Sequence, residues 1–566
     1  MPAIVRRGVL VALTYLTIAV VATADVWDTP TTRYVGSIPD ALQSIWFLSW
    51  TAHALAHHQS LVFTHAMNAP YGVNLLWNTG MLLPGVLATP LTLTLGPVFA
   101  YNILALAALS TSASAGYVAI NHFTHHYLAS WFGGLLFGFS PFVTAQLLGH
   151  LDLMVLFYPA VVLILFDEIV IKQQRRSWMT GAALGVLTAA QFFIFEELVV
   201  SVGICFAAGL IVACVEWRSD VATHWGYLAK ALAVATATSA LCIGWAVWFQ
   251  VRGPLVPPGL SEVANATGND VLAFVTPTAG QLASPVFAHD VAARFAAQSI
   301  GQGSYLGVPL ILLLALIIHH FWAQALIRLL AITAVLSAVL SMGSPLNILG
   351  WVSPVPLPWV IFGHLPVVSN LIPLRFVVFT FLCAGTLVGY GLAQLRNLKT
   401  PRAAAVLVLT TLVLISWWPR YPLPSLSVPT PAELPAAISS RIPEGGTVLF
   451  APYPSYSAAD AMYYQLESGF KFSLVKGYAY QMGPDLPLQS ALDGCGEHAI
   501  HHATQQIGVP TIRSAVVRAY VALGTTDIVV PPGPCATAFV LLFTNLLQSR
   551  PLTVGGFATW DLRPGR

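Results

Sequence analysis

Long apolar runs separated by short polar segments dominate the first 420 residues of the chain. A helix needs roughly 17–25 mostly apolar residues to cross a bilayer. Runs of this kind lie near 8–24, 98–120, 128–147, 150–170, 177–195, 197–216, 227–250, 303–321, 323–343, 373–394 and 402–419. Two further segments, 81–95 and 345–364, are apolar but interrupted by proline, which disfavours a continuous helix. The pattern therefore predicts about 11–13 transmembrane helices.

The pattern changes after residue 420. A proline-rich stretch over 421–435 predicts a semi-rigid linker. Beyond it, strands are expected at 446–451, 472–480, 526–530 and in a final hairpin through 557–562, and helices at 458–468, 512–523 and 536–548. This alternation predicts a C-terminal α/β domain. The predicted organisation is a transmembrane domain over 1–420 with outer loops 25–80 and 251–303, a linker over 421–435, and an extracytoplasmic α/β domain over 436–566.

The composition supports a membrane protein. Only 8% of the residues are charged, whereas soluble domains carry roughly 25%, so lipid must solvate most of the chain. Charged residues become denser after residue 420, which marks a domain boundary. The net charge of +2 and the lack of a basic tract exclude nucleic acid as an expected partner.

Basic residues predict the orientation, because cytoplasmic loops are enriched in Lys and Arg. They cluster at Arg6–Arg7, Lys172–Arg176, Arg218 with Lys230, Arg328, and 396–402. Cytoplasmic placement of these clusters puts the long loops and the C-terminal domain outside a plasma membrane. If 81–95 were a full span, the number of crossings would put Lys172–Arg176 on the outer side. Either that segment does not cross, or part of 41–58 adds a crossing.

Six cysteines divide into two groups. Four lie inside apolar runs and are typical of small hydrophobic residues. Cys495 and Cys535 could form a disulfide in an oxidising compartment, although two isolated cysteines more often stay free. Because no cysteine or histidine spacing is typical of zinc, no resident metal or cofactor is expected, with a divalent cation as the open alternative.

Polar residues beside the apolar runs are the candidate functional residues, because such groups are costly near lipid. Asp40 begins an amphipathic segment after the first span, in which Trp46 and Trp50 suit a membrane interface. A carboxylate there could accept a proton from a hydroxyl. The alternative is a helix cap.

Five more candidates lie at predicted outer ends of spans. His150 and Asp152 could bind a hydroxyl, a phosphate or, less readily, a metal, or they form a solvated turn. Glu196 and Glu197 could bind cations or act as acid and base, or they are ordinary charges at a helix turn. Arg375 could bind a phosphate, with phospholipid headgroups as the alternative partner.

Four segments together resemble the GT-C superfamily of multi-span glycosyltransferases, which use polyprenyl-phosphate-linked sugars outside the cytoplasm. They are PDALQSIWFLSW, NAPYGVNLLWNTGMLLPG, GHLDLMVLFYP and IPLRF, and a soluble domain after the last span also fits. The chain departs from the family in one respect: Asp40 lacks the acidic neighbour that many members have, which weakens any requirement for a metal.

The resemblance implies roles for these residues. Asp40 would be the general base, and Arg375 would neutralise the phosphate of the lipid-linked donor. His150 and Asp152 would orient sugar hydroxyls, and the C-terminal domain, with aromatic segments such as GYAYQM, would contact an envelope glycan acceptor. The partners it implies are membrane lipid, a polyprenyl-phosphate sugar and that acceptor.

Two other classes of function stay open at this point. A lipid or sugar transporter or flippase would need a polar path through the bundle, for which Glu196 and Glu197 are the best candidates. A non-catalytic membrane protein of envelope assembly would use the soluble domain as its binding module.

Overall fold

The computed structural model describes residues 3–78, 80–217, 225–257, 268–295, 303–365, 367–431, 433–480 and 486–563. The chain forms two compact units. Unit 1 comprises residues 1–27, 103–244 and 258–424, and unit 2 comprises residues 28–102, 245–257 and 425–566. Unit 2 thus joins the C-terminal residues to a segment, 28–102, that precedes most of the predicted spans.

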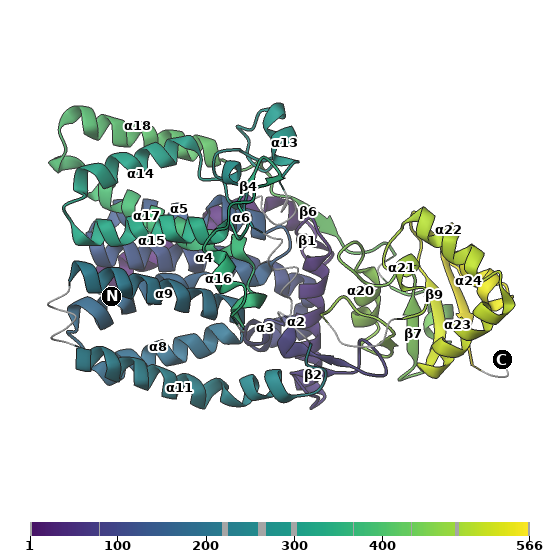
Figure 1. Ribbon diagram of the computed structural model, residues 1–566. Helices are drawn as coiled ribbons and strands as arrows, with labels where there is room; N and C mark the ends of the chain where they lie inside the picture. The colour runs from purple at the N-terminus through teal and green to yellow at the C-terminus, as the bar shows by residue number, and fades with distance from the viewer. Residues whose placement is uncertain are drawn as a thin grey trace. The chain divides into compact units, whose positions relative to one another are not determined.

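Unit 1 is a bundle of helices that lie side by side (Figure 1). Its helices are α1 (Ala3–Ala22), α5 (Tyr127–Gly138), α6 (Pro141–Gln146), α7 (Phe157–Phe166), α8 (Ser177–Phe192), α9 (Glu196–Glu216), α14 (Val308–Phe321), α15 (Ala325–Ser341), α17 (Val377–Ala393) and α18 (Thr400–Trp417). Most of α4 (Pro97–Thr124) and α11 (Trp225–Arg252) also belongs to this unit. Each of the long apolar runs found in the sequence falls on these helices.

Seven helical segments among the described residues are long and apolar enough to cross a membrane: Pro97–Thr124, Tyr127–Gln146, Leu151–Lys172, Glu196–Glu216, Trp225–Arg252, Pro373–Ala393 and Thr400–Trp417. Shorter apolar helices include α14 and α15. The protein is therefore a multi-pass membrane protein, as the composition predicts. Arg218, one of the basic residues used for orientation, lies outside the described residues.

The centre of unit 1 is α17, whose side chains are almost all buried. It packs on α5 and α15. At the contact with α5, a Cβ on Gly133 would lie 2.5 Å from the backbone oxygen of Gly385, and a Cβ on Gly385 would lie 2.8 Å from that of Gly133. Small residues let transmembrane helices approach this closely, and the approach maximises van der Waals contact between them.

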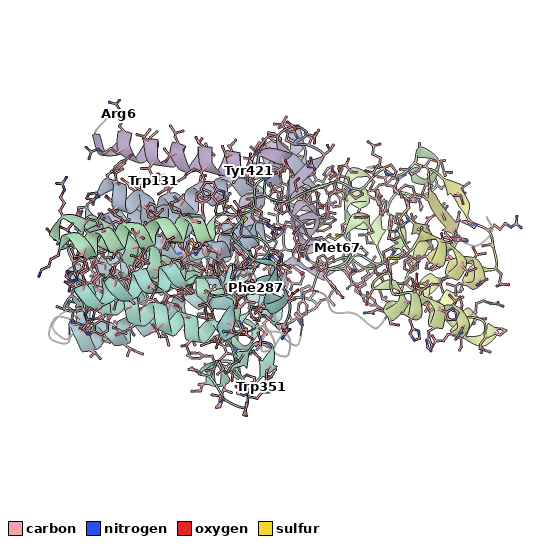
Figure 2. All side chains as sticks on the ribbon, turned by 90° about the horizontal axis from the view of Figure 1, so that it is seen from above. Arg6, Met67, Trp131, Phe287, Trp351 and Tyr421 are labelled. Atoms are coloured by element: carbon pink, nitrogen blue, oxygen red, sulfur yellow. A yellow bond between two sulfur atoms is a disulfide. The ribbon has the colours of Figure 1, made fainter. Side chains whose placement is uncertain are left out.

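The proline-rich segment 345–364 does not form a spanning helix. It contains a hairpin of β4 (Asn347–Ile348) and β5 (Trp351–Val352), followed by the single-turn helix α16 (Trp359–Phe362). Trp351, at the hairpin, has 61% of its surface exposed and projects from the ribbon (Figure 2).

In unit 2, α2 (Asp40–Ala56) packs on α3 (Leu82–Leu95). Helix α3 has 14 residues and contains Pro90, so it is shorter than the roughly 17–25 residues that a crossing needs. Strands β2 (Phe63–Thr64) and β3 (Val73–Asn74) form a small hairpin in the loop between them. Strand β1 (Arg33–Val35) pairs antiparallel with β6 (Ser425–Ser427), which lies inside the predicted linker.

The C-terminal part of unit 2 contains a five-stranded mixed sheet in the order β10–β11–β9–β7–β8. The strands are β7 (Thr447–Phe450), β8 (Ser473–Leu474), β9 (Thr525–Val530), β10 (Leu552–Val554) and β11 (Phe557–Asp561). Its larger helices are α20 (Asp460–Glu467), α22 (Glu497–Gln506), α23 (Pro510–Ala522) and α24 (Ala536–Leu547). A C-terminal domain of strands and helices is confirmed.

Side chains that alternate along the strands cover two faces of this sheet. On one face, Leu449 and Ile528 join a buried core with α22, α23 and α24. On the other, Phe450 stacks on Tyr464 of α20 with ring centroids 6.1 Å apart. The domain is therefore layered, with helices on both faces of the sheet.

Cys495 and Cys535 form a disulfide. From the sequence, this pairing was one of two alternatives, and two free thiols were the commoner one. The disulfide links the start of α22 to the start of α24, two helices that share the buried core.

Candidate functional site

The candidate residues fall into two groups. Asp40 belongs to unit 2, whereas His150, Asp152, Glu196, Glu197 and Arg375 belong to unit 1.

Asp40 is the first residue of α2, directly after Pro39 at the N-cap position. The partial positive charge of a helix N-terminus favours a carboxylate in the first turn. Its Oδ1 accepts a hydrogen bond from the hydroxyl of Tyr478 at 2.8 Å. Asp40 is half-buried, so its carboxylate is held in place but still accessible to solvent.

Tyr478 comes from the C-terminal part of unit 2, in the aromatic segment that the sequence predicted to contact an acceptor. Its backbone oxygen accepts a hydrogen bond from Gln43 Nε2 at 2.7 Å, which ties the segment to α2. The neighbouring Tyr480 exchanges two backbone hydrogen bonds with the side chain of Asn78, at 2.5 and 2.9 Å. The next residues of the segment, 481–485, lie outside the described residues.

Burial raises the pKa of Tyr478, and the negative charge of Asp40 and the hydrogen bond to it raise the pKa further. The phenol therefore keeps its proton throughout the neutral range, where it can only donate to Asp40. A donated hydrogen bond of this kind fixes the orientation of the carboxylate. The arrangement suits a carboxylate that accepts a proton from a ligand.

The two tryptophans of α2 are placed differently from what the sequence predicts. Trp46 is fully buried, with 0% of its surface exposed, and donates its indole N–H to Gln465 Oε1 of α20 at 2.8 Å. Trp50 is also buried and stacks on Trp46 at 5.8 Å. Their expected place at a lipid interface is therefore wrong: these rings join α2 to the C-terminal part of unit 2.

In unit 1, Glu197 and Arg375 form an ion pair between the start of α9 and the turn before α17. Glu197 also accepts the backbone N–H of Ile372 at 2.9 Å. The guanidinium of Arg375 lies over the ring of Phe195, 5.2 Å from its centroid. These three contacts fix the position of the arginine side chain.

Asp152 and Glu196 lie near this ion pair, close enough for their charges to interact with each other and with Glu197. Asp152 is buried in the short 3-10 helix Leu151–Met154, and His150 caps that helix. The structure thus brings together four of the five candidates, from three separate predicted spans.

This cluster in unit 1 holds three carboxylates and one guanidinium. The Nε atom of Arg375 is buried and has no hydrogen-bond partner among the described residues, so one donor is left for a ligand. Carboxylates around a fixed arginine can bind a ligand that carries hydroxyls next to an anion. Within the described ranges, no three His, Cys, Asp or Glu side chains form a group that could hold a metal ion.

Sequence reasoning identified the residues of this cluster but not their pairing, and it missed Tyr478 as a partner of Asp40. The signal available was the aromatic GYAYQM segment, which the sequence assigned to acceptor contact rather than to the base.

The comparisons with known proteins concern the fold. No protein-family model matches the chain, and no curated protein matches it. Sixteen chains of solved structures match in fold. The arabinofuranosyltransferase AftD from Mycobacteria superposes with a TM-score of 0.50 at 12% identity, over 98% of this chain and 40% of that one.

The oligosaccharyltransferase AglB from Archaeoglobus fulgidus, solved with an inhibitory peptide and a dolichol-phosphate, gives a TM-score of 0.46 at 10% identity. That match covers 95% of this chain and 71% of that one. The chain spans two fifths of the length of AftD. The superposition on AftD agrees with the predicted GT-C-like membrane fold.

Proposed function

We propose that this protein is a membrane glycosyltransferase that moves a sugar from a polyprenyl-phosphate donor to a glycan or lipid acceptor of the cell envelope. The observation that carries the proposal is the hydrogen bond from Tyr478 to Asp40. This hydrogen bond links Asp40, which is expected to be the base, with the C-terminal domain, which is expected to bind the acceptor. The GT-C-like fold supports a lipid-linked donor.

Asp40 acts as the general base in this proposal. Its carboxylate takes the proton of the acceptor hydroxyl while that oxygen attacks the anomeric carbon of the donor sugar. A new glycosidic bond forms, and the bond between the anomeric carbon and the phosphate oxygen breaks. The polyprenyl phosphate leaves with the electron pair and, as a phosphate ester, needs no proton at neutral pH, so one base suffices.

The unit 1 cluster binds the donor. The guanidinium of Arg375 interacts with the phosphate of the lipid, while Glu197 keeps it in a fixed orientation. The remaining polar groups, His150, Asp152 and Glu196, accept or donate hydrogen bonds to sugar hydroxyls. A guanidinium suits this role because it is planar and always charged.

The C-terminal domain lies outside the cytoplasm in this account. Disulfides persist in oxidising compartments, and the Cys495–Cys535 bond fits that location. The short helix α3 removes the conflict in the crossing count if it stays on the outer side. All basic clusters then face the cytoplasm of a plasma-membrane protein.

The proposal is tested by sugar transfer from labelled polyprenyl-phosphate sugars to envelope acceptors, in membranes with and without the protein. We expect product only with the protein, and loss of product with Asp40→Asn. Asp28→Asn is the matched control, because Asp28 is an exposed carboxylate on the same outer segment. Uptake of the lipid into liposomes without product would instead indicate a transporter. Normal envelope assembly with Asp40→Asn would indicate a non-catalytic partner.

A further inference from the structure

An open cleft of about 860 Å³ lies on unit 2, beside the second half of α2. Three segments line it: the end of α2, the loop and strand over 59–66, and the turn between α20 and β8. Gln465 holds these segments together, because its Nε2 donates to the backbone oxygens of Ala66 and Phe472 at 2.6 and 2.8 Å. The cleft is therefore built on a fixed framework.

Aromatic rings form one wall of the cleft. Phe470 contacts Trp50 edge-on, with centroids 5.3 Å apart, and contacts His53 at 4.7 Å. Phe470 adopts a φ of +59°, a left-handed backbone conformation that is unfavourable for a residue with a side chain. Strained residues of this kind concentrate at ligand sites, and here the strain places the ring against Trp50 and His53.

Hydrogen-bonding groups form another wall of the cleft. Ser60 Oγ accepts backbone N–H groups at 3.2 and 3.3 Å, and Thr64 Oγ1 accepts one at 2.9 Å. Because both hydroxyl oxygens accept, each hydroxyl keeps its own proton to donate. The ring of His65 is 3.1 Å from the backbone oxygen of Pro70 through Nδ1. That oxygen can only accept, so Nδ1 carries a proton in this contact.

Uncharged residues and histidines line the cleft. None of the described residues that line it is Asp, Glu, Lys or Arg. Burial, followed by the neighbouring His57, lowers the pKa of His53, which keeps this ring neutral as well. The indole nitrogen of Trp50 is buried and has no hydrogen-bond partner among the described residues.

A sugar ring matches both walls. Its C–H face is apolar and packs on aromatic rings, and its hydroxyls both donate and accept hydrogen bonds. An anionic headgroup would find no cation here, and an acyl chain would leave the hydroxyls and imidazole of the polar wall unpaired.

We propose that this cleft binds a neutral sugar unit of the acceptor glycan, at a distance from the hydroxyl that reacts. Trp50 follows Asp40 by ten positions on one helix, which corresponds to roughly 15 Å along the axis. The cleft would thus hold a unit several sugars from the reacting end. Binding energy from such a remote contact can be used to orient the reacting hydroxyl. The identity of the ligand as an acceptor rests on the proposed function.

The test measures equilibrium binding of labelled oligosaccharides to the full-length protein in nanodiscs. The probes are neutral hexasaccharides of arabinofuranose, galactofuranose and mannopyranose. We expect at least one to bind saturably. Gln59 and His65 both line the cleft, so Gln59→Ala with His65→Ala should weaken this binding at least tenfold. The matched control is Gln505→Ala with His498→Ala, the same residue types on α22, which should leave binding unchanged.

A second variant separates binding from folding. Phe470→Gly removes the ring and relieves the left-handed backbone, which offsets part of the lost packing on Trp50 and His53. The protein should therefore stay folded while binding weakens at least tenfold. Absence of saturable binding for all three probes, or equal binding by the cleft variants, would overturn the inference.

Asp40→Asn distinguishes this inference from the proposed function. We expect it to bind the hexasaccharide normally and to transfer no sugar to it. In transfer assays, the cleft variants should lose activity toward the hexasaccharide at least tenfold more than toward the matching disaccharide. Cleft-dependent binding without any transfer by the wild-type protein would support the cleft and refute the transferase. If the cleft variants transfer sugar with an unaltered preference for long acceptors, the cleft is not an acceptor site, but the transferase proposal still holds.

Discussion

Tyr478→Phe is the substitution that most directly probes the link between Asp40 and the C-terminal domain. It removes one hydroxyl and leaves the ring, the backbone bond to Gln43 and the rest of the segment in place. A hydrogen bond to a charged group contributes about 1.5–3 kcal/mol. Each 1.4 kcal/mol corresponds to a factor of about ten in rate.

We expect the lower end of this range, because Asp40 is half-buried and water can replace part of the lost bond. Tyr478→Phe should therefore reduce kcat/KM for sugar transfer about tenfold. Initial rates with purified protein and a labelled lipid-linked donor provide the measurement. Tyr456→Phe is the control, because the Tyr456 side chain is exposed in the same domain.

The effect should not depend on pH near neutrality. Burial and Asp40 raise the pKa of Tyr478 above its ordinary value, so the hydroxyl keeps its proton and the bond persists from pH 6 to 9. The ratio of wild-type to Tyr478→Phe rates should be constant over that range. An unchanged rate for Tyr478→Phe, or a ratio that collapses to one at pH 9, would refute the reasoning.

Three further predictions concern the framework. Glu197→Gln removes the ion-pair partner of Arg375 but leaves Glu196 nearby, so it should cost less than the roughly 3–5 kcal/mol of an uncompensated buried charge. In a thermal-denaturation cycle, combining it with Arg375→Gln should cost less than the sum of the single changes, and strict additivity would argue against the ion pair. Replacing both disulfide cysteines by serine should destabilise the C-terminal domain by about 2–4 kcal/mol. Reduction of the denatured wild type should expose two additional maleimide-reactive thiols, and an unchanged number of maleimide adducts would contradict the disulfide. Gly133→Val should lower the melting temperature, because its Cβ would lie 2.5 Å from a backbone oxygen of α17. Gly203→Val is the control and should melt normally, because a Cβ there meets nothing within 4 Å. Equal melting temperatures of the two variants would refute the close helix contact.

The sequence predicted the elements better than their contacts. Apolar runs locate the helices of unit 1 because a membrane span must be long and apolar. In the C-terminal domain, β7, β9, α20, α23 and α24 begin and end within a few residues of the prediction. The predicted strand over 472–480 is shorter, with only Ser473–Leu474 in the sheet, because the residues after it bond to α2 and to the loop after β3.

Contacts between distant segments could not be read from periodicity. Tyr478 and Asp40 are 438 positions apart, and nothing in either local pattern indicates the partner. The same holds for Trp46. Its position on an amphipathic helix suits a lipid interface as well as a protein contact, and only the fold shows that its partner is Gln465. The candidate residues could be found because charge near apolar runs is unusual, whereas Glu197–Arg375 required the fold.

The most direct test of the transferase account is the stoichiometry of the reaction in proteoliposomes that contain only the purified protein, a polyprenyl-phosphate sugar and an acceptor glycan. The account predicts one polyprenyl phosphate released for each sugar joined to the acceptor, with Asp28→Asn as active as wild type and Asp40→Asn inactive. Transfer that persists in Asp40→Asn, or donor consumed without glycosylated acceptor, would contradict it.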